Sequence, residues 1–157
     1  MIVNRLTPLV ADRITVTLHE LVALLDAYAD DVLRAEHAIT FGDYRYLATL
    51  AELDRPDITE LARCLMLTKA AVSKHLPALE ARGWVERSAD PAHARRVVVG
   101  LTPAGVRVVE EAGGRLDADF AAAFTGGHPP LDLDALHAGL RTAVVRVQER
   151  LAGPPPR

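Results

Sequence analysis

The chain has 157 residues, of which half are hydrophobic and 4% are aromatic, and it carries a formal net charge of −3. This length fits one compact domain, or a small lobe joined to an assembly element, and a core made mainly of Leu, Val and Ala favours helices. No apolar run approaches the roughly 20 residues that span a bilayer, the N-terminus lacks a signal-peptide pattern, and a single cysteine excludes an internal disulfide, so we expect a cytoplasmic protein.

The first predicted element is a long helix over residues 8–36. Apolar residues recur there at alternating spacings of four and three, which indicates one apolar seam on a largely acidic helix. The seam consists of Val10, Ile14, Leu18, Leu21, Leu25, Tyr28 and Val32. A seam of this length needs a partner helix, in this chain or in a second copy.

A shorter helix is predicted next. Thr40 and Asp43 have the spacing of a capping box, and the helix that they begin runs to about Leu53. The Asp-Arg-Pro sequence at residues 54–56 then breaks the helix.

The third and fourth predicted helices follow each other closely and form a helix-turn-helix. The third starts near Asp57, and the fourth starts at Thr68, a suitable N-cap, and ends before Gly83. The residues expected to face inward are Ile58, Leu61, Ala62 and Leu65 in the third helix, and Val72, Leu76 and Leu79 in the fourth.

A β-hairpin is expected after the fourth helix. Its strands are residues 84–87 and 97–101, and the linking segment 88–96 contains the turn signal Asp90-Pro91. A helix-turn-helix followed by such a wing is a shape that lies on duplex DNA. The fold class is therefore mainly α with a small β-hairpin wing.

Two more helices are predicted at the C-terminus. Thr102-Pro103 opens the first of them, with Gly113-Gly114 as a weak point, and residues 126–130 end it. The last helix covers about residues 132–151. Its single apolar face consists of Leu133, Leu136, Leu140, Val144 and Val147.

The second helix of a helix-turn-helix reads the major groove with its N-terminal residues. The candidate DNA contacts there are Thr68, Lys69, Ala70, Ser73, Lys74 and His75. With Val72 and Leu76 in the core, the side chains at 69, 70, 73 and 74 fall on the outward side. The lysines suit phosphate or guanine contacts, and Ser73 suits a base edge or a phosphate. The simpler alternative is an ordinary solvated helix face.

The wing supplies the second group of candidates. Arg95 and Arg96 are adjacent, so on a strand they point to opposite sides. One can enter a minor groove, and the other can contact a phosphate or an acidic neighbour. Residues 55–101 carry eight Lys/Arg and five Asp/Glu, whereas residues 1–54 have a net charge of −5. Such a local positive charge is what phosphate contacts require.

Other chemistries have weaker support. Cys64 is the only thiol; a redox switch needs a lowered pKa and solvent access, and a half-buried filler is the simpler interpretation. No two of the six histidines have helical metal-ligand spacing, which leaves open only a zinc site assembled across helices. We find no phosphate-binding loop, and we predict neither a cofactor nor an enzymatic activity.

The stretch from Ile39 to Gly105 resembles the MarR family of bacterial winged-helix regulators. The resembling segments are TFGDYRYLATLAE, TELARCL, LTKAAVSKHLPALEARGWVER and DPAHARRVVVGLTPAG. The most specific are LEARGWVER before the wing and GLTPAG after it. The helices on either side also fit, so the resemblance covers nearly the whole chain.

The resemblance implies a homodimer that represses transcription at a pseudo-palindromic operator until a small molecule, often a phenolic or other aromatic acid, binds. It also implies that Ser73, Lys74 and Arg95 contact DNA. The domains would then be a dimerisation helix (1–38), a winged helix-turn-helix lobe (39–105), C-terminal dimerisation helices (106–151) and a flexible tail (152–157). The effector pocket would lie between the first helix and the DNA lobe, with His19, Tyr28, His37, Tyr44 and Tyr46 as candidates.

Three residues depart from the family pattern. His93 stands where an aspartate usually holds the wing arginine, and a protonated imidazole there would repel Arg95. Met66 replaces a glycine in the turn between the third and fourth helices, where a positive φ would strain it. Pro77 lies inside the fourth helix and predicts a kink between Ser73 and Pro77. These departures motivate an alternative, an interaction module that has lost DNA binding; a thiol-switched regulator that uses Cys64 is a third hypothesis.

Overall fold

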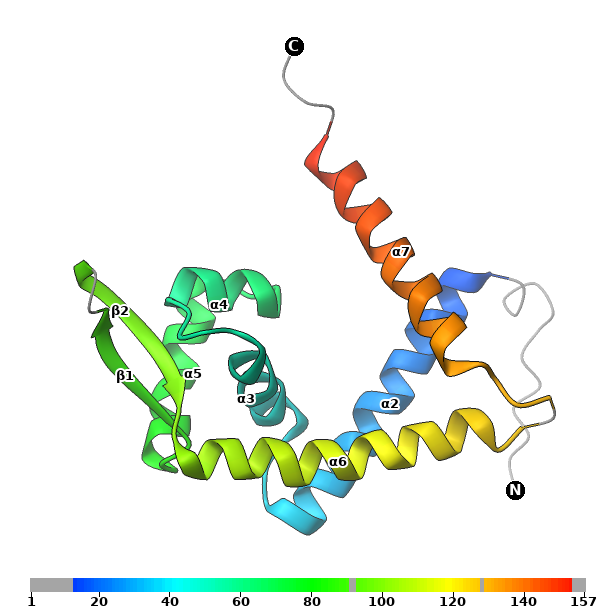
Figure 1. Cartoon of the computed structure of the whole chain (residues 1–157), viewed down its shortest axis with the longest axis horizontal. Coiled ribbons are helices and arrows are strands. Elements are labelled where there is room, and N and C mark those ends of the chain that lie inside the picture. Colours follow the sequence, from blue (N-terminus) through cyan, green and yellow to red (C-terminus); the bar gives the residue numbers. More distant parts are fainter. Residues whose placement is uncertain (1–12, 91–92, 128, 154–157) are drawn as a thin grey trace. The chain divides into compact units, whose positions relative to one another are not determined.

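The computed structural model describes residues 13–90, 93–127 and 129–153; the side chains of residues 93–95 lie outside this description. The chain divides into two compact units, one up to Gly114 and one from Arg115 onward. Helices dominate both, and the described strands form one two-stranded sheet (Figure 1). The predicted fold class is therefore confirmed. None of the described helices is both long enough and apolar enough to span a membrane.

Helix α2 (Ile14–His37) is followed by α3 (Phe41–Glu52). Between them, Thr40 and Asp43 form the predicted capping box: the Asp43 N–H donates to Thr40 Oγ1 over 2.9 Å, and the Thr40 N–H donates to Asp43 Oδ2 over 3.2 Å. These bonds satisfy backbone donors that a helix N-terminus leaves free. They fix the corner between the two helices.

The buried face of α2 differs from the predicted seam. Ala29 and Leu33 are the buried residues of this helix, whereas Ile14, Leu18 and Tyr28 are exposed. The predicted seam contained Tyr28 and Val32, so its last positions lie one residue before the buried Ala29 and Leu33; Ala29 was passed over because the pattern was built on large side chains. The predicted positions before residue 13, including Val10, lie outside the described residues.

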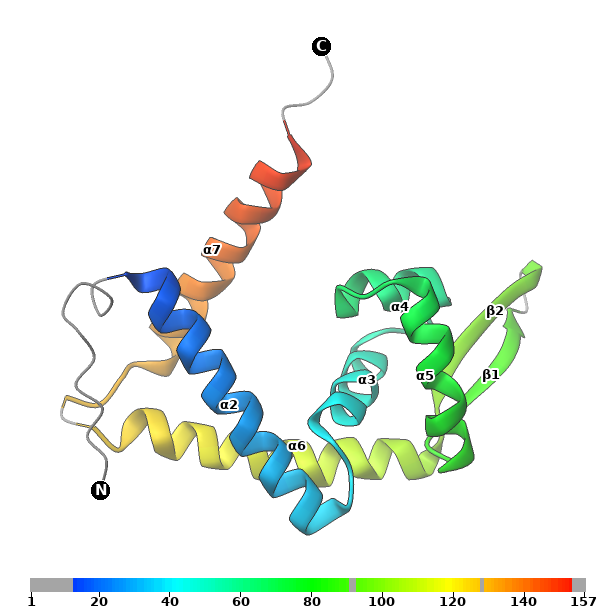
Figure 2. The same ribbon diagram turned by 180° about the vertical axis from the view of Figure 1, so that it is seen from behind.

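Helices α4 (Ile58–Leu65) and α5 (Lys69–Ala81) form the helix-turn-helix, seen from both sides in Figures 1 and 2. The Asp57 carboxylate accepts from the Glu60 N–H over 2.8 Å, and the Thr68 hydroxyl accepts from the Ala71 N–H over 3.1 Å. Both predicted starts are confirmed. The buried residues are Leu61, Ala62 and Leu65 in α4, and Val72, Leu76 and Leu79 in α5; Ile58 is half-buried.

The turn between these helices has the conformation that a glycine would favour. Met66 has φ 55° and ψ 39°, so of the two possibilities, a strained positive φ or a turn built differently, the structure shows the positive φ. Its side chain is 87% exposed and gains no packing in return. Further along, α5 is helical on both sides of Pro77, whose side chain is exposed. The kink expected near Pro77 stays a prediction.

Strands β1 (Val85–Asp90) and β2 (His93–Leu101) make the wing. They pair antiparallel from Val85–Leu101 to Ala89–Val97, with an irregularity before Asp90. The predicted nine-residue link, 88–96, was wrong, because Ser88 and Ala89 continue the ladder. Ladder hydrogen bonds come from the backbone, so small residues without a strong strand preference can continue the pairing.

Helix α6 (Pro103–Thr125) begins at the base of the wing, and α7 (Leu133–Ala152) ends the described chain. Thr102 caps α6 by accepting from the Gly105 N–H over 3.1 Å, while its hydroxyl donates to the Gly83 carbonyl over 2.6 Å. A Cβ at Gly105 would collide with the Trp84 carbonyl oxygen, so glycine is required there. Gly113 does not interrupt α6.

Helix α7 has no buried residue within this single chain. Its N-cap is Asp132, which accepts from the Ala135 N–H over 3.0 Å, and the helix begins close to the predicted residue 132. On its predicted apolar face, Leu140, Val144 and Val147 are exposed.

Candidate nucleic-acid interface

The N-terminal half of α5 presents a mixed small and cationic face to solvent. Lys69, Ala70, Ser73 and Lys74 are exposed, while the interleaved Val72 is buried against the core. The structure therefore places these four side chains outward, as their spacing predicts. Small residues at positions 70 and 73 let another molecule approach the helix backbone closely.

Three cations around this face are free to bind an external anion. Within the part of the chain that the structure describes, Lys69 and Lys74 on α5 and Arg63 on α4 make no ion pair. Arg63 was not among the candidate contacts, although its exposed position three residues before the turn was visible in the sequence. Free cations beside an accessible helix are the elements that phosphate binding needs.

Arg96 is committed to neighbouring carboxylates, in contrast to these free cations. Its Nε lies 2.9 Å from Asp57 Oδ2, and its two Nη atoms lie 3.5 Å from Asp90 Oδ2 and 3.7 Å from Glu60 Oε2. The hydrogen bond from the Glu60 N–H, followed by that from Arg96, lowers the pKa of the Asp57 carboxyl. Arg96 was a candidate DNA contact; the structure shows the other alternative, an acidic neighbour, and gives this arginine a bracing role. The side chains of His93 and Arg95 lie outside the described residues.

Further contacts join the wing to the helices. Arg87 of β1 makes a two-point pair with Glu80 of α5, at 2.7 and 2.6 Å. Arg55, in the loop before α4, donates to Ser88 Oγ over 2.8 Å, and the Val99 N–H donates to the Pro56 carbonyl over 2.9 Å. The wing is thereby held against α4, α5 and the loop that precedes them.

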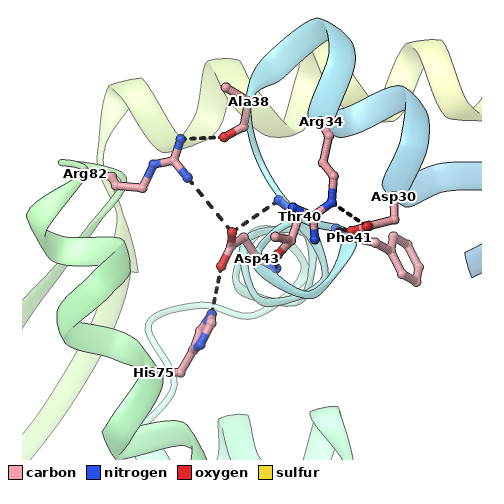
Figure 3. A network of polar contacts seen from close by, with 8 residues as sticks. All are labelled: Asp30, Arg34, Ala38, Thr40, Phe41, Asp43, His75 and Arg82. Atoms are coloured by element: carbon pink, nitrogen blue, oxygen red, sulfur yellow. Dashed lines mark hydrogen bonds and ion pairs between the residues drawn. The ribbon is translucent and has the colours of Figure 1, made fainter. Parts of the chain in front are cut away.

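His75 faces inward although it was a candidate DNA contact. Its Nε2 lies 2.9 Å from Asp43 Oδ1 (Figure 3). Its ring stacks on Tyr46 with the ring centroids 4.4 Å apart. Burial raises the pKa of the Tyr46 phenol. On α5, His75 shares the inner side with Val72, Leu76 and Leu79, which are three or four positions away or adjacent. It therefore bridges α5 to α3 and does not point outward with Lys74.

The residues predicted to line an effector pocket have diverse surroundings. Tyr46 is buried beneath His75, Tyr44 stacks on Phe41, and Tyr44 Oη occupies the space that a Cβ at Gly113 would need. Tyr28 and His19 are exposed, and His37 is half-buried. Only Tyr46 is therefore enclosed by its own neighbours, and it fills the core.

A groove of about 400 Å³ lies elsewhere on the first unit. It is lined by apolar side chains and one carboxylate, from Leu50, Ala51, Leu101, Val106, Val109 and Glu110. None of the predicted effector residues lines it. Cys64, interpreted above as a half-buried filler, is exposed on α4. Among the described residues, no three His, Cys, Asp or Glu side chains lie close enough together to hold a metal ion.

Comparison with known families identifies the winged lobe. A model described as the MarR family matches residues 39–96, from the α2–α3 corner to Arg96 of the wing. Residues 39–96 therefore form a MarR-family winged lobe. The transcriptional regulator HosA of Escherichia coli O111:H- is 33% identical in an alignment of 87 residues that covers 52% of this chain and 64% of HosA. The match thus spans less than two thirds of that relative.

Solved structures share the fold over most of the chain. The regulator CouR from Rhodococcus jostii RHA1, bound to p-coumaroyl-CoA, is 20% identical with a TM-score of 0.77, over 90% of this chain and 95% of CouR. FabT from Streptococcus pneumoniae, in complex with DNA, is 19% identical with a TM-score of 0.74, over 90% of this chain and 99% of FabT. The chain therefore has the winged-helix fold of MarR-family transcriptional regulators.

Proposed function

We propose that this MarR-family chain is a sequence-specific, DNA-binding transcriptional regulator. The observation that carries the proposal is the face of α5, where two lysines flank small residues beside a braced wing and have no ion-pair partner among the described residues. Lys69 and Lys74 contact phosphates or guanine edges, and Ser73 reaches a base edge in the major groove. Arg63 adds a phosphate contact from α4.

The regulator acts as a homodimer on a pseudo-palindromic operator. Exposed apolar residues along α7 and the N-terminal half of α2 support this part of the proposal; they are Ile14, Val22, Leu24, Leu140, Val144, Val147 and Leu151. Apolar faces of this length are covered in stable proteins. Sedimentation at micromolar concentration tests it: a dimer is expected, and a stable monomer contradicts it.

The regulator is a repressor that a small molecule releases from DNA. This part rests on the family and on CouR, which binds p-coumaroyl-CoA. Aromatic acids or their thioesters are the first compounds to screen, by thermal shift and by release of bound DNA. If none of a broad set of such compounds shifts the melting temperature, the aromatic-acid class is rejected for this chain.

The DNA-binding proposal is tested with the DNA upstream of the chain's own gene. Fluorescence anisotropy compares this duplex with a shuffled duplex of the same length and composition, because non-specific affinity depends on phosphate charge alone. We expect at least a hundredfold preference for the upstream DNA. This bound is set below the typical ratio of specific to non-specific affinity, about 10³–10⁷, because a shuffled duplex can contain partial sites. Equal affinity for both duplexes would reject the proposal and favour a winged-helix interaction module.

A further inference from the structure

Helix α5 is held to α3 mainly by side chains. The α5 backbone approaches α4 and β1 closely, and it approaches α3 hardly at all. The polar link across this gap is the 2.9 Å contact between His75 Nε2 and Asp43 Oδ1 (Figure 3). Since Ser73 and Lys74 directly precede His75, this contact lies one helical turn or less from the face proposed to read DNA.

Asp43 is a fixed anchor for this contact. Its side chain is only 14% exposed, and its second oxygen accepts from the Thr40 N–H in the capping box at the start of α3. The same oxygen lies 4.0 Å from Arg82 Nη1. A carboxylate held from both sides in this way has little freedom to follow a moving partner, so His75 must come to it.

Arg82 supplies a second point of attachment at the other end of α5. Its Nη2 donates to the Ala38 carbonyl over 2.7 Å, and its guanidinium lies 3.9 Å above the Trp84 ring. Residues 75 and 82 are seven positions apart, which places them on the same side of a helix about 10 Å apart. Two directional attachments at this spacing define the direction of the helix axis.

We propose that His75 is a positioning residue for DNA recognition: through Asp43 it sets the orientation in which α5 presents Lys69, Ser73 and Lys74. The inference rests on the proposed DNA-binding function. In this proposal the imidazole N–H orients α5 by donating to Asp43, and the imidazole ring separately packs on Tyr46. Loss of the N–H should thus impair sequence-specific binding, which needs base edges in register, and spare non-specific binding, which needs only exposed cations.

Two substitutions separate the two tasks of His75. His75→Phe keeps the ring on Tyr46 and removes the donor, whereas His75→Gln removes the ring and keeps an N–H donor at nearly the same reach. Both are measured against the upstream and the shuffled duplex, with thermal unfolding of each variant alongside. We expect His75→Phe to lose about tenfold in affinity for upstream DNA, and His75→Gln to stay within about twofold of wild type. Neither should change affinity for the shuffled duplex by more than about twofold.

Arg34→Ala is the matched control, because Arg34 belongs to the same corner and pairs with Asp30 on its own helix without touching α5. It should leave the preference for upstream DNA unchanged. If His75→Phe proves unstable, amide hydrogen exchange of His75→Gln and Asp43→Asn without DNA replaces the comparison: exchange in the first half of α5 should rise for Asp43→Asn and not for His75→Gln.

The outcomes distinguish this inference from the proposed function. A wild-type chain without preference for upstream DNA rejects the function itself. A wild-type preference that His75→Phe retains, or that both His75 variants lose equally, overturns only the positioning role.

Discussion

The turn between α4 and α5 offers a direct test of how the backbone limits stability. Met66 adopts φ 55°, the left-handed region, with its side chain 87% exposed. For a residue with a Cβ this conformation costs about 1–2 kcal/mol. Glycine avoids that cost and loses about 0.5–1 kcal/mol more backbone entropy on folding. Met66→Gly should therefore raise the free energy of unfolding by roughly 0.5–1 kcal/mol, the difference between these two effects.

Thermal and urea unfolding at one fixed protomer concentration measure this change, because any association makes apparent stability depend on concentration. For a chain of this size the melting temperature should rise by about 1–4 °C. Met66→Ala is the matched control: it removes the side chain, keeps the Cβ and should leave stability nearly unchanged. A stability gain shared equally by the Ala and Gly variants would show that the Met side chain, and not the backbone, carries the cost, and no gain in either would refute the reasoning.

The remaining predictions concern the wing brace and the paired glycines of α6. Arg96→Gln should lower the free energy of unfolding by about 0.5–1 kcal/mol, since the arginine is 42% exposed and solvent screens its three pairs; an unchanged urea midpoint would remove the brace from the account. Because the pKa of Asp57 is lowered in the folded state, its carboxylate stabilises the fold at pH values above the unfolded pKa, and this contribution is lost as pH falls through the folded pKa. Asp57→Asn, which still caps α4, should therefore lose less stability than wild type below about pH 4, and parallel pH profiles of the two proteins would contradict this. A Cβ at Gly114 would meet no atom, so Gly114→Ala should stabilise α6 by roughly 0.5–1 kcal/mol. A Cβ at Gly113 would lie 2.9 Å from Tyr44 Oη, so Gly113→Ala should gain less or lose stability. Equal effects of the two substitutions on the melting temperature would show that the Tyr44 side chain moves aside without cost.

Local chemistry made much of the fold predictable from the sequence. The capping pairs at Thr40, Asp57 and Thr68 are satisfied within three or four residues, so their hydrogen bonds depend only on neighbours in the chain. The position of Met66 in the turn raised the question of a positive φ, but the sequence left open whether the turn is built that way. The family motifs then placed these elements in the right order.

Less could be predicted where partners distant in the sequence decide the outcome. Ser88 and Ala89 belong to β1 because of what lies opposite them in β2, which no alternation of side chains reveals. His75 turns inward because Asp43, 32 residues earlier, offers an acceptor there. Arg96 is held by Asp57, 39 residues before it, so its commitment to an acidic neighbour was one of two open alternatives. In each case the residue type indicated the kind of contact, but the sequence did not reveal which distant residue would make it.

The salt dependence of DNA binding tests the central claim about the α5 face most directly. Affinity for the upstream duplex is measured between about 50 and 200 mM salt for wild type and for Lys69→Gln/Lys74→Gln. The control is Arg107→Gln, which removes an exposed cation on α6 that has no ion pair with any described residue. If both lysines bind phosphates, the slope of log affinity against log salt should become shallower by about 1 for each lysine in each protomer, while the control keeps the wild-type slope. A double variant with the wild-type affinity and slope would contradict the account.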